Sequence, residues 1–434
     1  MELLTKYNKN SKSKNNNAIL SIIAISIILF FLSACGNTDK NVEKVKDESD
    51  VIDDFVGPRM NLAQNIKFYY ANATLYENSP IRLSDRPKKN EIDFDNNHLY
   101  IFTGKRINIA VTGLDGKIDY VSKIADANHI ISILIETGEI EIISIPRDTR
   151  CDLGYEIVKG YDKNKLTYCR DIAGRERYHK ELARIGKLDT IHYYVEFGFS
   201  QAMGIIEFLG YKEPANTLQV LRNRKAIGGD DYQRCYNQGQ FIRQALLSHF
   251  NKFTGALGNV LIRSALLLVE TNLTAYSAED IVNRLEKVEY PQTSESVVVH
   301  ILPPNKIAYK NYDFTTEETI LDLITKIEDY NKNLFKKGKS KPYKVIDVQQ
   351  RLNDVLLAAA GDTAKNPGRV ISRLSPYFTQ RAWYQVKDKN ERSKIRDEFG
   401  VLLSVAYNKK DRKEDAEIVL KIVEADKVMF ENIK

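Results

Sequence analysis

Short β-branched runs alternate with segments of helical periodicity between residues 107 and 303, and this alternation constrains the fold more than any other feature. The first runs are INIAVTG (107–113), HIISILIE (129–136) and EIEIISI (139–145), each the length of a buried strand. The last two are joined through Thr137 and Gly138, which is typical of a β-hairpin. We therefore predict an α/β domain with a central mixed sheet flanked by helices.

The rest of this domain follows the same alternation. The residue pattern predicts further strands at 190–197, 217–224 and 296–303. Apolar spacing predicts helices at 199–210, 232–250 and 259–270. After about residue 310 long β-branched runs are absent, and the charged, amphipathic segments predict a C-terminal all-helical region with helices at 316–335, 345–360, 368–376, 390–407 and 411–431.

The N-terminus has the layout of a secretory signal. Four lysines up to Lys14 precede an apolar run at 18–32, which is shorter than the about 20 residues that span a bilayer. The run ends Leu-Ser-Ala-Cys at 32–35, which resembles the bacterial lipobox, where the cysteine carries the lipid. We predict that residues 1–34 are a lipoprotein signal peptide and that Cys35 is lipidated, with palmitate among its acyl chains. A short signal anchor that ends in a cysteine is the alternative.

Composition and local character divide the remaining chain. The polar stretch 35–58 is predicted to be a flexible tether, 59–104 an accessory N-terminal segment, 105–309 the α/β domain and 310–434 the helical domain. With 43% hydrophobic and 28% charged residues, the chain is neither wholly disordered nor a multi-span membrane protein. The net charge of +6 is too small for a nucleic-acid footprint over the whole surface.

Lipidation of Cys35 would leave Cys151, Cys169 and Cys235. At most one intrachain disulfide can then form, and both a Cys151–Cys169 pair and three unpaired thiols remain open. No CxxC motif and no His/Cys cluster in the sequence indicates zinc.

Acidic and basic residues gather at the ends of the predicted strands. Asp115 follows the first strand, Asp126 precedes the second, and Arg147 follows the hairpin. Loops at strand ends are where α/β sheets usually bind ligands.

A second set of charged residues follows in the chain. Arg222 and Arg224 are two apart, so on the predicted strand they share a face. Asp231, Arg234 and Gln238 lie at i, i+3 and i+7, so on a helix they also share a face. Taken singly, each motif also fits a solvated surface, and it is the clustering that favours a site.

The chemistry of these side chains indicates a pyrophosphate ligand. Guanidinium groups bind phosphate in a bidentate manner and stay charged at any working pH. Carboxylates among them indicate a divalent cation, with Asp115 and Asp126 as its ligands and phosphate oxygens completing the shell.

The same motifs resemble the LytR–CpsA–Psr family. GLDGK, the strand of Asp126, SIPRDT, HYYVEFGF, LRNR…DDYQR…Q and LLVETNLT occur in that order over about residues 105–305. Members are extracytoplasmic, membrane-tethered α/β enzymes that transfer a glycopolymer from a polyprenyl pyrophosphate carrier to peptidoglycan with Mg²⁺. The resemblance implies metal binding by Asp115 and Asp126. It also implies that pyrophosphate is bound by Arg147, Arg222, Arg224, Arg234 and Gln238.

We therefore predict a lipid-anchored, extracytoplasmic glycopolymer transferase of cell envelope biogenesis, at the outer face of the cell membrane or in the periplasm, with polyprenyl pyrophosphate hydrolysis as a side activity. Its catalytic residues are Arg147, Asp231 and Asp115, and either aspartate could accept the proton of the acceptor hydroxyl. Its partners are the lipid-linked glycan and the peptidoglycan acceptor, and no nucleic acid. The alternative is a lipid-anchored binding protein for the same pyrophosphate or glycan that has lost transfer.

Two details qualify the resemblance. Lys117 stands where the family commonly has arginine, and Ala125, Ala127, Tyr236 and Asn237 also depart from its pattern, so the site is less positive. The polyprenyl chain needs an apolar slot, whose candidate residues equally fit an ordinary core. These candidates are Phe197, Phe199, Phe208, Leu266 and Leu267.

Overall fold

The structure is a computed structural model, and it describes residues 84–85, 104–116, 118, 122–156, 162–336 and 346–432. The predicted signal peptide, the tether, Cys35 and Lys117 lie outside the described residues, as does nearly all of the accessory segment. All described residues fall within one compact unit. Among them, no helix combines the length and the apolar character needed to cross a membrane.

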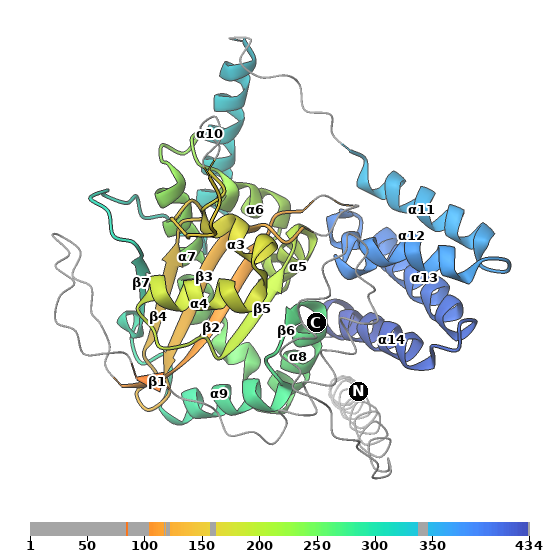
Figure 1. The fold of residues 1–434 in the computed structure, drawn as a ribbon, viewed down its shortest axis with the longest axis horizontal. Helices are drawn as coiled ribbons and strands as arrows, with labels where there is room; N and C mark the ends of the chain where they lie inside the picture. Colours follow the sequence, from red (N-terminus) through yellow and green to blue (C-terminus); the bar gives the residue numbers. More distant parts are fainter. Residues whose placement is uncertain are drawn as a thin grey trace, which may run out of the picture. The chain divides into compact units, whose positions relative to one another are not determined.

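A seven-stranded mixed sheet forms the centre of the α/β part (Figure 1), as predicted. Its order is β6-β5-β2-β3-β4-β7, with β1 paired to β2. The pairs β2–β5 and β4–β7 are parallel, whereas β2–β3, β3–β4 and β5–β6 are antiparallel. The strands are β1 (Ser84–Asp85), β2 (Lys105–Leu114), β3 (Ala125–Leu134), β4 (Ile140–Ile145), β5 (Tyr193–Phe197), β6 (Glu270–Thr271) and β7 (Val297–Ile301).

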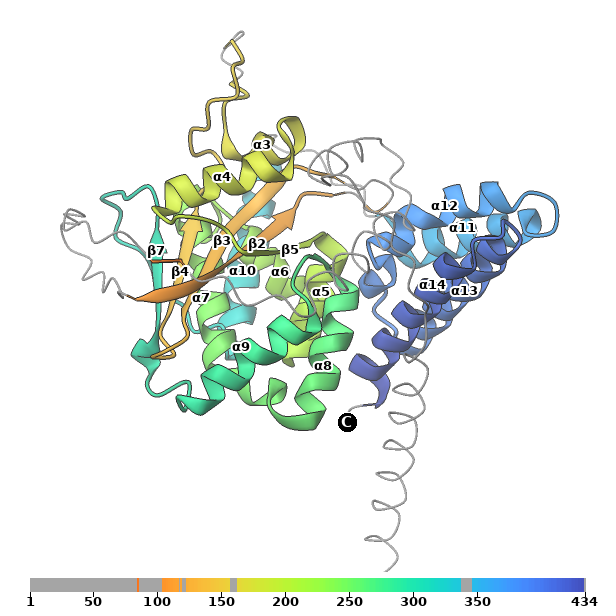
Figure 2. The ribbon, with the colours of Figure 1, turned by 60° about the horizontal axis from the view of Figure 1, so that its bottom comes forward.

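Helices cover both faces of the sheet (Figures 1 and 2). Successive strand residues point to opposite faces, so in β2 Ile107 and Ile109 enter one apolar core and Ala110 enters another. Both cores are buried, which explains why the central strands are almost continuously apolar. One face is covered by α3 (Leu166–Ile172) and α4 (Gly174–Gly186), and the other by α7 (Asp231–His249), α8 (Gly255–Leu268) and α9 (Ala275–Lys287).

The predicted hairpin joins β3 to β4. Gly138 has φ +76°, a conformation that favours glycine, and its N–H donates to the Leu134 carbonyl at 2.8 Å. A Cβ at this position would lie 2.8 Å from Val288, so the turn also needs glycine for lack of space.

The predicted strand at 217–224 is wrong. The chain instead forms α6 (Pro214–Arg222), after α5 (Phe199–Leu209) at the expected place. Pro214 has its φ preset for the first turn, and the buried positions Thr217, Leu218, Val220 and Leu221 follow helical spacing. Thr217 and Val220 had suggested a strand because β-branched residues favour one, but propensity yields to burial of this face. Helices α3, α4 and α9 were not predicted.

The C-terminal region is helical, as predicted. Its helices are α10 (Glu317–Lys336), α11 (Val348–Asp362), α12 (Pro367–Thr379), α13 (Lys389–Asn408) and α14 (Lys413–Lys427). Short turns of 3-10 helix occur at η3 (Phe250–Phe253), η4 (Ser294–Ser296) and η5 (Ala382–Gln385), and a π turn at η6 (Val428–Asn432).

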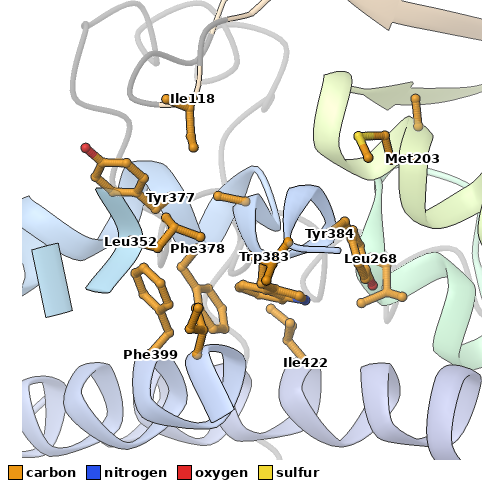
Figure 3. Close-up of a cluster of buried hydrophobic side chains, with 14 of the residues drawn as sticks. Ile118, Met203, Leu268, Leu352, Tyr377, Phe378, Trp383, Tyr384, Phe399 and Ile422 are labelled. Carbon is orange, nitrogen blue, oxygen red and sulfur yellow. The ribbon is translucent and has the colours of Figure 1, made fainter. Parts of the chain in front are cut away.

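An aromatic core holds these helices together (Figure 3). Trp383, Phe378 and Phe399 are fully buried in it. The same cluster includes Met203 of α5 and Leu268 of α8, so the helical region and the α/β part share one apolar core. The boundary predicted near residue 310 stays a prediction.

Candidate functional site

A small cleft opens where β2 ends and β3 begins. Its cavity volume of about 70 Å³ is well below the roughly 300–1,000 Å³ of typical ligand pockets. Four charged or polar side chains, those of Asp115, Asp126, Arg222 and Gln238, line it together with apolar residues and glycines. The other lining residues are Gly113, Leu114, Gly116, Ala127, Phe197, Gly198, Phe199, Ala202 and Leu218.

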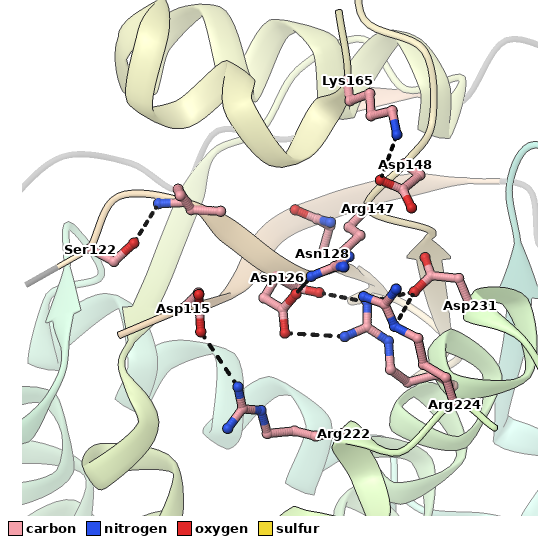
Figure 4. Close-up of polar contacts among 12 residues, drawn as sticks. Asp115, Ser122, Asp126, Asn128, Arg147, Asp148, Lys165, Arg222, Arg224 and Asp231 are labelled. Atoms are coloured by element: carbon pink, nitrogen blue, oxygen red, sulfur yellow. Dashed lines mark hydrogen bonds and ion pairs between the residues drawn. The ribbon is translucent and has the colours of Figure 1, made fainter. Parts of the chain in front are cut away.

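Antiparallel pairing brings Asp115 and Asp126 to this cleft. Leu114 pairs with Ala125 after an irregularity at Gly113, and the Asp115 N–H donates to the Ile124 carbonyl at 2.8 Å. The two acids, separated in sequence, therefore flank the same end of the β2–β3 pair (Figure 4).

Asp126 is held by two arginines. Arg147 donates through Nη1 to Asp126 Oδ1, and Arg234 Nη1 donates to Oδ2 at 3.1 Å. Arg234 Nη2 also donates to the Asp126 carbonyl at 3.1 Å. Burial raises the pKa of the Asp126 carboxyl, but the charges of Arg234 and Arg147 outweigh it, and the pKa is below its usual value.

Asp231 pairs with Arg234 as well, and links it to a third arginine, Arg224. Its Oδ1 lies 2.8 Å from Arg234 Nη2 and 3.2 Å from Arg224 Nε. Burial, together with the charge of Arg234, lowers the pKa of the Arg224 guanidinium, which still remains charged because it starts so high. The predicted helix face is confirmed: Asp230 caps α7 by accepting from Tyr232 N and Gln233 N, and the turns that follow direct Asp231 and Arg234 into the cluster.

Arg222 contacts the other acid. As the last residue of α6, it reaches Asp115 Oδ1 at 3.4 Å, whereas Arg224 lies beyond the helix and faces Asp231. The prediction that they share one strand face is therefore wrong, yet both still join the cluster because the chain turns between them. Asp115 and Arg222 are about half exposed, while Arg234 is only 3% exposed.

Gln238 lines the cleft, but its amide is already engaged. Its Oε1 lies 3.3 Å from His129 Nε2, and its Nε2 donates to the Leu221 carbonyl at 3.0 Å. His129 Nδ1 lies 2.8 Å from the Ser144 hydroxyl, and burial lowers the pKa of His129 to about 4. The neutral imidazole therefore donates to Gln238 and accepts from Ser144.

Behind the acids, buried polar residues that the sequence analysis missed hold β2 and β3. The Tyr178 hydroxyl donates to Asn128 Oδ1 at 2.6 Å and lies 3.0 Å from the Thr112 hydroxyl. His129 and Asn128 stand at the start of an otherwise apolar run, which gave no sign of their partners on α4 and α7.

The cluster still has buried donors without partners. Arg147 Nε and Arg234 Nε are buried and have no hydrogen-bond partner among the described residues. Both Asp231 oxygens also lack a hydrogen bond there, but Oδ1 lies within ion-pair distance of Arg224 and Arg234. An unpaired buried donor costs about 1–3 kcal/mol, so these groups favour a ligand that carries acceptor oxygens. The arginine cluster consists of four arginines and three aspartates, and its excess of one positive charge also favours an anion. Its members are Arg147, Arg222, Arg224, Arg234, Asp115, Asp126 and Asp231.

Asp115 and Asp126 are the residues that could hold a divalent cation. The described residues contain no group of three or more His, Cys, Asp or Glu side chains arranged for a metal. Mg²⁺ commonly binds through one or two carboxylates and substrate phosphates, so two acids at one cleft fit this mode of coordination. Among the described residues, the Asp115 carboxylate pairs only with Arg222, at 3.4 Å, so it has lone pairs left for a cation.

Only some of the predicted slot residues line the cleft. Phe197 and Phe199 do, and the Arg222 guanidinium lies 5.1 Å from the centre of the Phe199 ring. Phe208, Leu266 and Leu267 are absent from its lining and pack against the cores.

The three described cysteines are free thiols. Cys151, Cys169 and Cys235 are all buried. The Cys151 and Cys169 side chains hydrogen-bond to each other on the α3 side of the sheet, whereas Cys235 lies on α7.

Comparison with known proteins supports the resemblance. Residues 68–210 match the model of the LytR_cpsA_psr family. Among curated proteins, none matches this chain.

Solved structures of low similarity align with about half of the chain. TagV of B. subtilis is 17% identical over 52% of this chain and 96% of that one, with a TM-score of 0.36. The gbs0355 protein of Streptococcus agalactiae is 14% identical over 56% and 90%, with a TM-score of 0.38. TagT bound to LI-WTA is 13% identical over 58% and 97%, with a TM-score of 0.32. Similarity at this level assigns no role to any residue.

Proposed function

With the LytR_cpsA_psr match at residues 68–210 as the premise, we propose that this chain transfers a glycopolymer from a polyprenyl pyrophosphate carrier to a cell-wall acceptor such as peptidoglycan. We further propose that it works outside the cytoplasm, with residues 1–34 removed as a signal peptide and Cys35 carrying the lipid anchor. The anchor would keep the cleft close to the membrane that holds the donor.

The arginine cluster is the observation that carries this proposal. A pyrophosphate has acceptor oxygens in two groups, and the cluster offers charged guanidiniums from α6, α7 and the loops after β4 and α6. Two of these guanidiniums, those of Arg147 and Arg234, have an unpartnered buried Nε, as described above. The ring of Phe199 beside Arg222 gives the start of a prenyl chain an apolar contact.

Because the cleft is small and its carboxylates occupy the arginines, binding requires the ion pairs to rearrange. Phosphate oxygens would replace the Asp126 carboxylate as the partner of Arg147. The guanidinium would thus keep a negatively charged acceptor throughout the exchange. Arg234 is the most buried of the four and contacts both Asp126 and Asp231, so it would keep the cluster together during the exchange.

In the proposed reaction an acceptor hydroxyl attacks the phosphorus on the glycan side. A new P–O bond forms to the acceptor, the bridging P–O bond breaks, and polyprenyl phosphate leaves with the bonding electron pair. Guanidiniums at the leaving phosphate stabilise its developing charge.

Asp115 is the better-placed acceptor for the hydroxyl proton. Its carboxylate is half exposed at the cleft and, among the described residues, contacts only Arg222, whereas Asp231 is largely buried and already paired with the guanidiniums of Arg224 and Arg234. Mg²⁺ or Mn²⁺ held by Asp115 and Asp126 would supply further charge stabilisation at the phosphates, and with Asp115 engaged in this way Asp231 would be the remaining acceptor for the proton.

The test uses the full-length protein in detergent with a short-chain polyprenyl pyrophosphate glycan and an acceptor glycan. Released polyprenyl phosphate and elongated acceptor are measured by mass spectrometry, with and without Mg²⁺. Arg147→Ala should abolish release. Arg150→Ala, an exposed arginine in the same loop, is the matched control and should retain it.

One outcome would contradict the transferase, and another would contradict the site assigned to it. Tight donor binding without release, in the presence of acceptor and metal, would favour the binding protein that has lost transfer. Unchanged release in Arg147→Ala would show that the arginine cluster is not the donor site.

A further inference from the structure

The turn between α12 and α13 contacts three parts of the α/β domain at once. Gln380 Nε2 donates to the Ile118 carbonyl at 3.2 Å, in the loop that begins at Asp115. Gln385 Nε2 donates to the Ser200 hydroxyl at 2.8 Å, next to Phe199 of the cleft. Arg381 Nη2 donates to the Leu267 carbonyl of α8 at 2.9 Å. We call residues 380–385 the brace.

Packing fixes the brace on the α/β domain. A Cβ on Gly204 of α5 would lie 2.6 Å from the Tyr384 ring, so helix and ring are in the closest possible contact. Arg381 is 4% exposed and has φ 53°, a left-handed conformation that costs energy in a non-glycine residue and persists only when its surroundings impose it. Its guanidinium also donates through Nη1 to the Phe378 and Thr379 carbonyls, so both of its Nη atoms are paired with backbone, while its Nε has no hydrogen-bond partner among the described residues.

The loop that carries Asp115 is anchored at both of its described points. Its base is closed by the hydrogen bond from Asp115 N to the Ile124 carbonyl. At its far side Ile118 is 8% exposed and belongs to the core cluster that contains Tyr377 and Leu352, and Figure 3 shows its side chain directed at these residues. The carbonyl of the same residue is the acceptor for Gln380.

Asp115 itself is weakly held. Its carboxylate is about half exposed, and its ion pair with Arg222 is 3.4 Å long. Asp115 lies three residues before Ile118, whose carbonyl accepts a hydrogen bond from a residue 262 positions later in the chain.

We infer that the C-terminal helical region is part of the frame of the donor site, and that Gln380 is a positioning residue that places Asp115 through Ile118. This inference rests on the proposed function. It assigns a role in transfer to a region that the family match at residues 68–210 does not reach.

Hydrogen exchange tests the contact without any assay of activity. Gln380→Met keeps the length and apolar stem of the side chain but removes the donor. Amide exchange in the peptide covering 114–124 should rise at least several-fold in this variant. Arg373→Met is the matched control, because it removes contacts of α12 with Ala358 and Asp362 inside the helical region alone. Unchanged exchange in Gln380→Met, or an equal rise in Arg373→Met, would overturn the inference.

A double-mutant cycle tests the action through Asp115. In the wild-type background Gln380→Met should lower kcat by roughly ten- to a hundredfold, because small misplacements of a reacting group are costly. In the Asp115→Asn background the same change should lower kcat less than twofold. An equal loss in both backgrounds would mean that Gln380 acts only on overall stability, and the inference would be wrong.

The two proposals fail in different ways. If the wild-type protein releases no polyprenyl phosphate, the proposed function fails, and the exchange experiment still decides whether the brace holds the loop. If the wild type is active and Gln380→Met matches it, the proposed function stands and the inference fails.

Discussion

The donor cleft and the brace lie close together but are stabilised in opposite ways. In the cleft, Asp126 and Asp231 are shared among arginines, and exposure ranges from 3% for Arg234 to 43% for Arg222. At the brace, Trp383, Ala382 and Tyr384 are buried within an apolar cluster. Charged pairs can exchange partners when an anion arrives, whereas a close-packed core cannot rearrange without loss of contacts. We therefore expect the ion pairs of the cleft to rearrange when a ligand binds and the packing of the brace to stay unchanged.

Removal of the largest buried side chain should show how rigid the packed region is. Trp383→Ala should lower the free energy of unfolding by about 3–5 kcal/mol, because it leaves a cavity and removes one of the two hydrogen bonds that Asp426 Oδ2 accepts from Trp383 and Tyr384. Urea denaturation followed by circular dichroism measures this. Leu357→Ala, at a 76% exposed position on α11, is the control and should change stability little. Equal effects of the two variants on the free energy of unfolding would contradict the claim that the region around Trp383 is rigidly packed.

Loss of Arg234, the most buried arginine of the cluster, should separate function from stability. Arg234→Met removes the contacts to both Asp126 and Asp231 and should lower transfer by roughly 10²–10³-fold. Its unfolding free energy should fall by only about 1–3 kcal/mol, because Arg147 and Arg224 still pair with the two acids. Arg263→Met, which breaks an exposed pair with Glu279, should leave both quantities nearly unchanged. A larger stability loss than in Trp383→Ala would show that the cleft is a structural centre.

Two glycines allow a matched test of close packing at the brace. Gly204→Ala should destabilise by about 1–3 kcal/mol, because its Cβ would meet the Tyr384 ring at 2.6 Å. Gly361→Ala, where a Cβ on α11 meets nothing within 4 Å, should stabilise by about 0.5–1 kcal/mol. Thermal melting distinguishes the two signs. A neutral Gly204→Ala would mean that Tyr384 yields easily, which contradicts a rigid brace.

Histidine protonation should lower stability at acid pH through the α/β part, since all six histidines precede residue 310. Burial lowers the pKa of His179 to about 4, so between pH 6.5 and 4 the unfolded chain binds a proton that the folded chain does not. The free energy of unfolding should therefore decrease as the pH is lowered from 6.5 to 4, by about 1 kcal/mol per pH unit for this group. His179→Phe keeps a ring against Tyr194 and should flatten the dependence of melting temperature on pH. An equally steep dependence in the variant would assign the acid sensitivity to other groups.

Much of the sheet could be predicted from the sequence because its periods are strong. The runs of β2, β3 and β4 are short, β-branched and bounded, and Thr137-Gly138 fixes the turn between the last two. The i, i+3, i+7 spacing on α7 likewise placed Asp231 and Arg234 correctly, because Asp230 starts the helix where the pattern begins.

The errors arise where local preference and tertiary packing disagree. The segment of α6 contains Thr217 and Val220, whose preference for strands is overridden by burial against α5 and α10. The error in secondary structure does not change the predicted membership of the cluster. Arg222 and Arg224 still reach it, from the end of a helix and from a loop instead of from one strand.

The contact of Gln380 with Ile118 could not be predicted at all. A hydrogen bond between residues so far apart leaves no periodic trace, and neither residue type indicates a partner. The ordering of the arginines and acids was found because it resembles a family, and the brace was missed because that resemblance ends near residue 305.

The central claim is that the arginine cluster binds a pyrophosphate, and calorimetric titration of a short prenyl pyrophosphate into the full-length protein tests it most directly. The matching prenyl monophosphate serves as the reference ligand, and both are titrated with and without Mg²⁺. We predict that the pyrophosphate binds at least about tenfold more tightly than the monophosphate, which corresponds to about 1.4 kcal/mol, and that Mg²⁺ widens this difference. Equal affinity for the two ligands, or a difference that survives in Arg147→Ala, would contradict it.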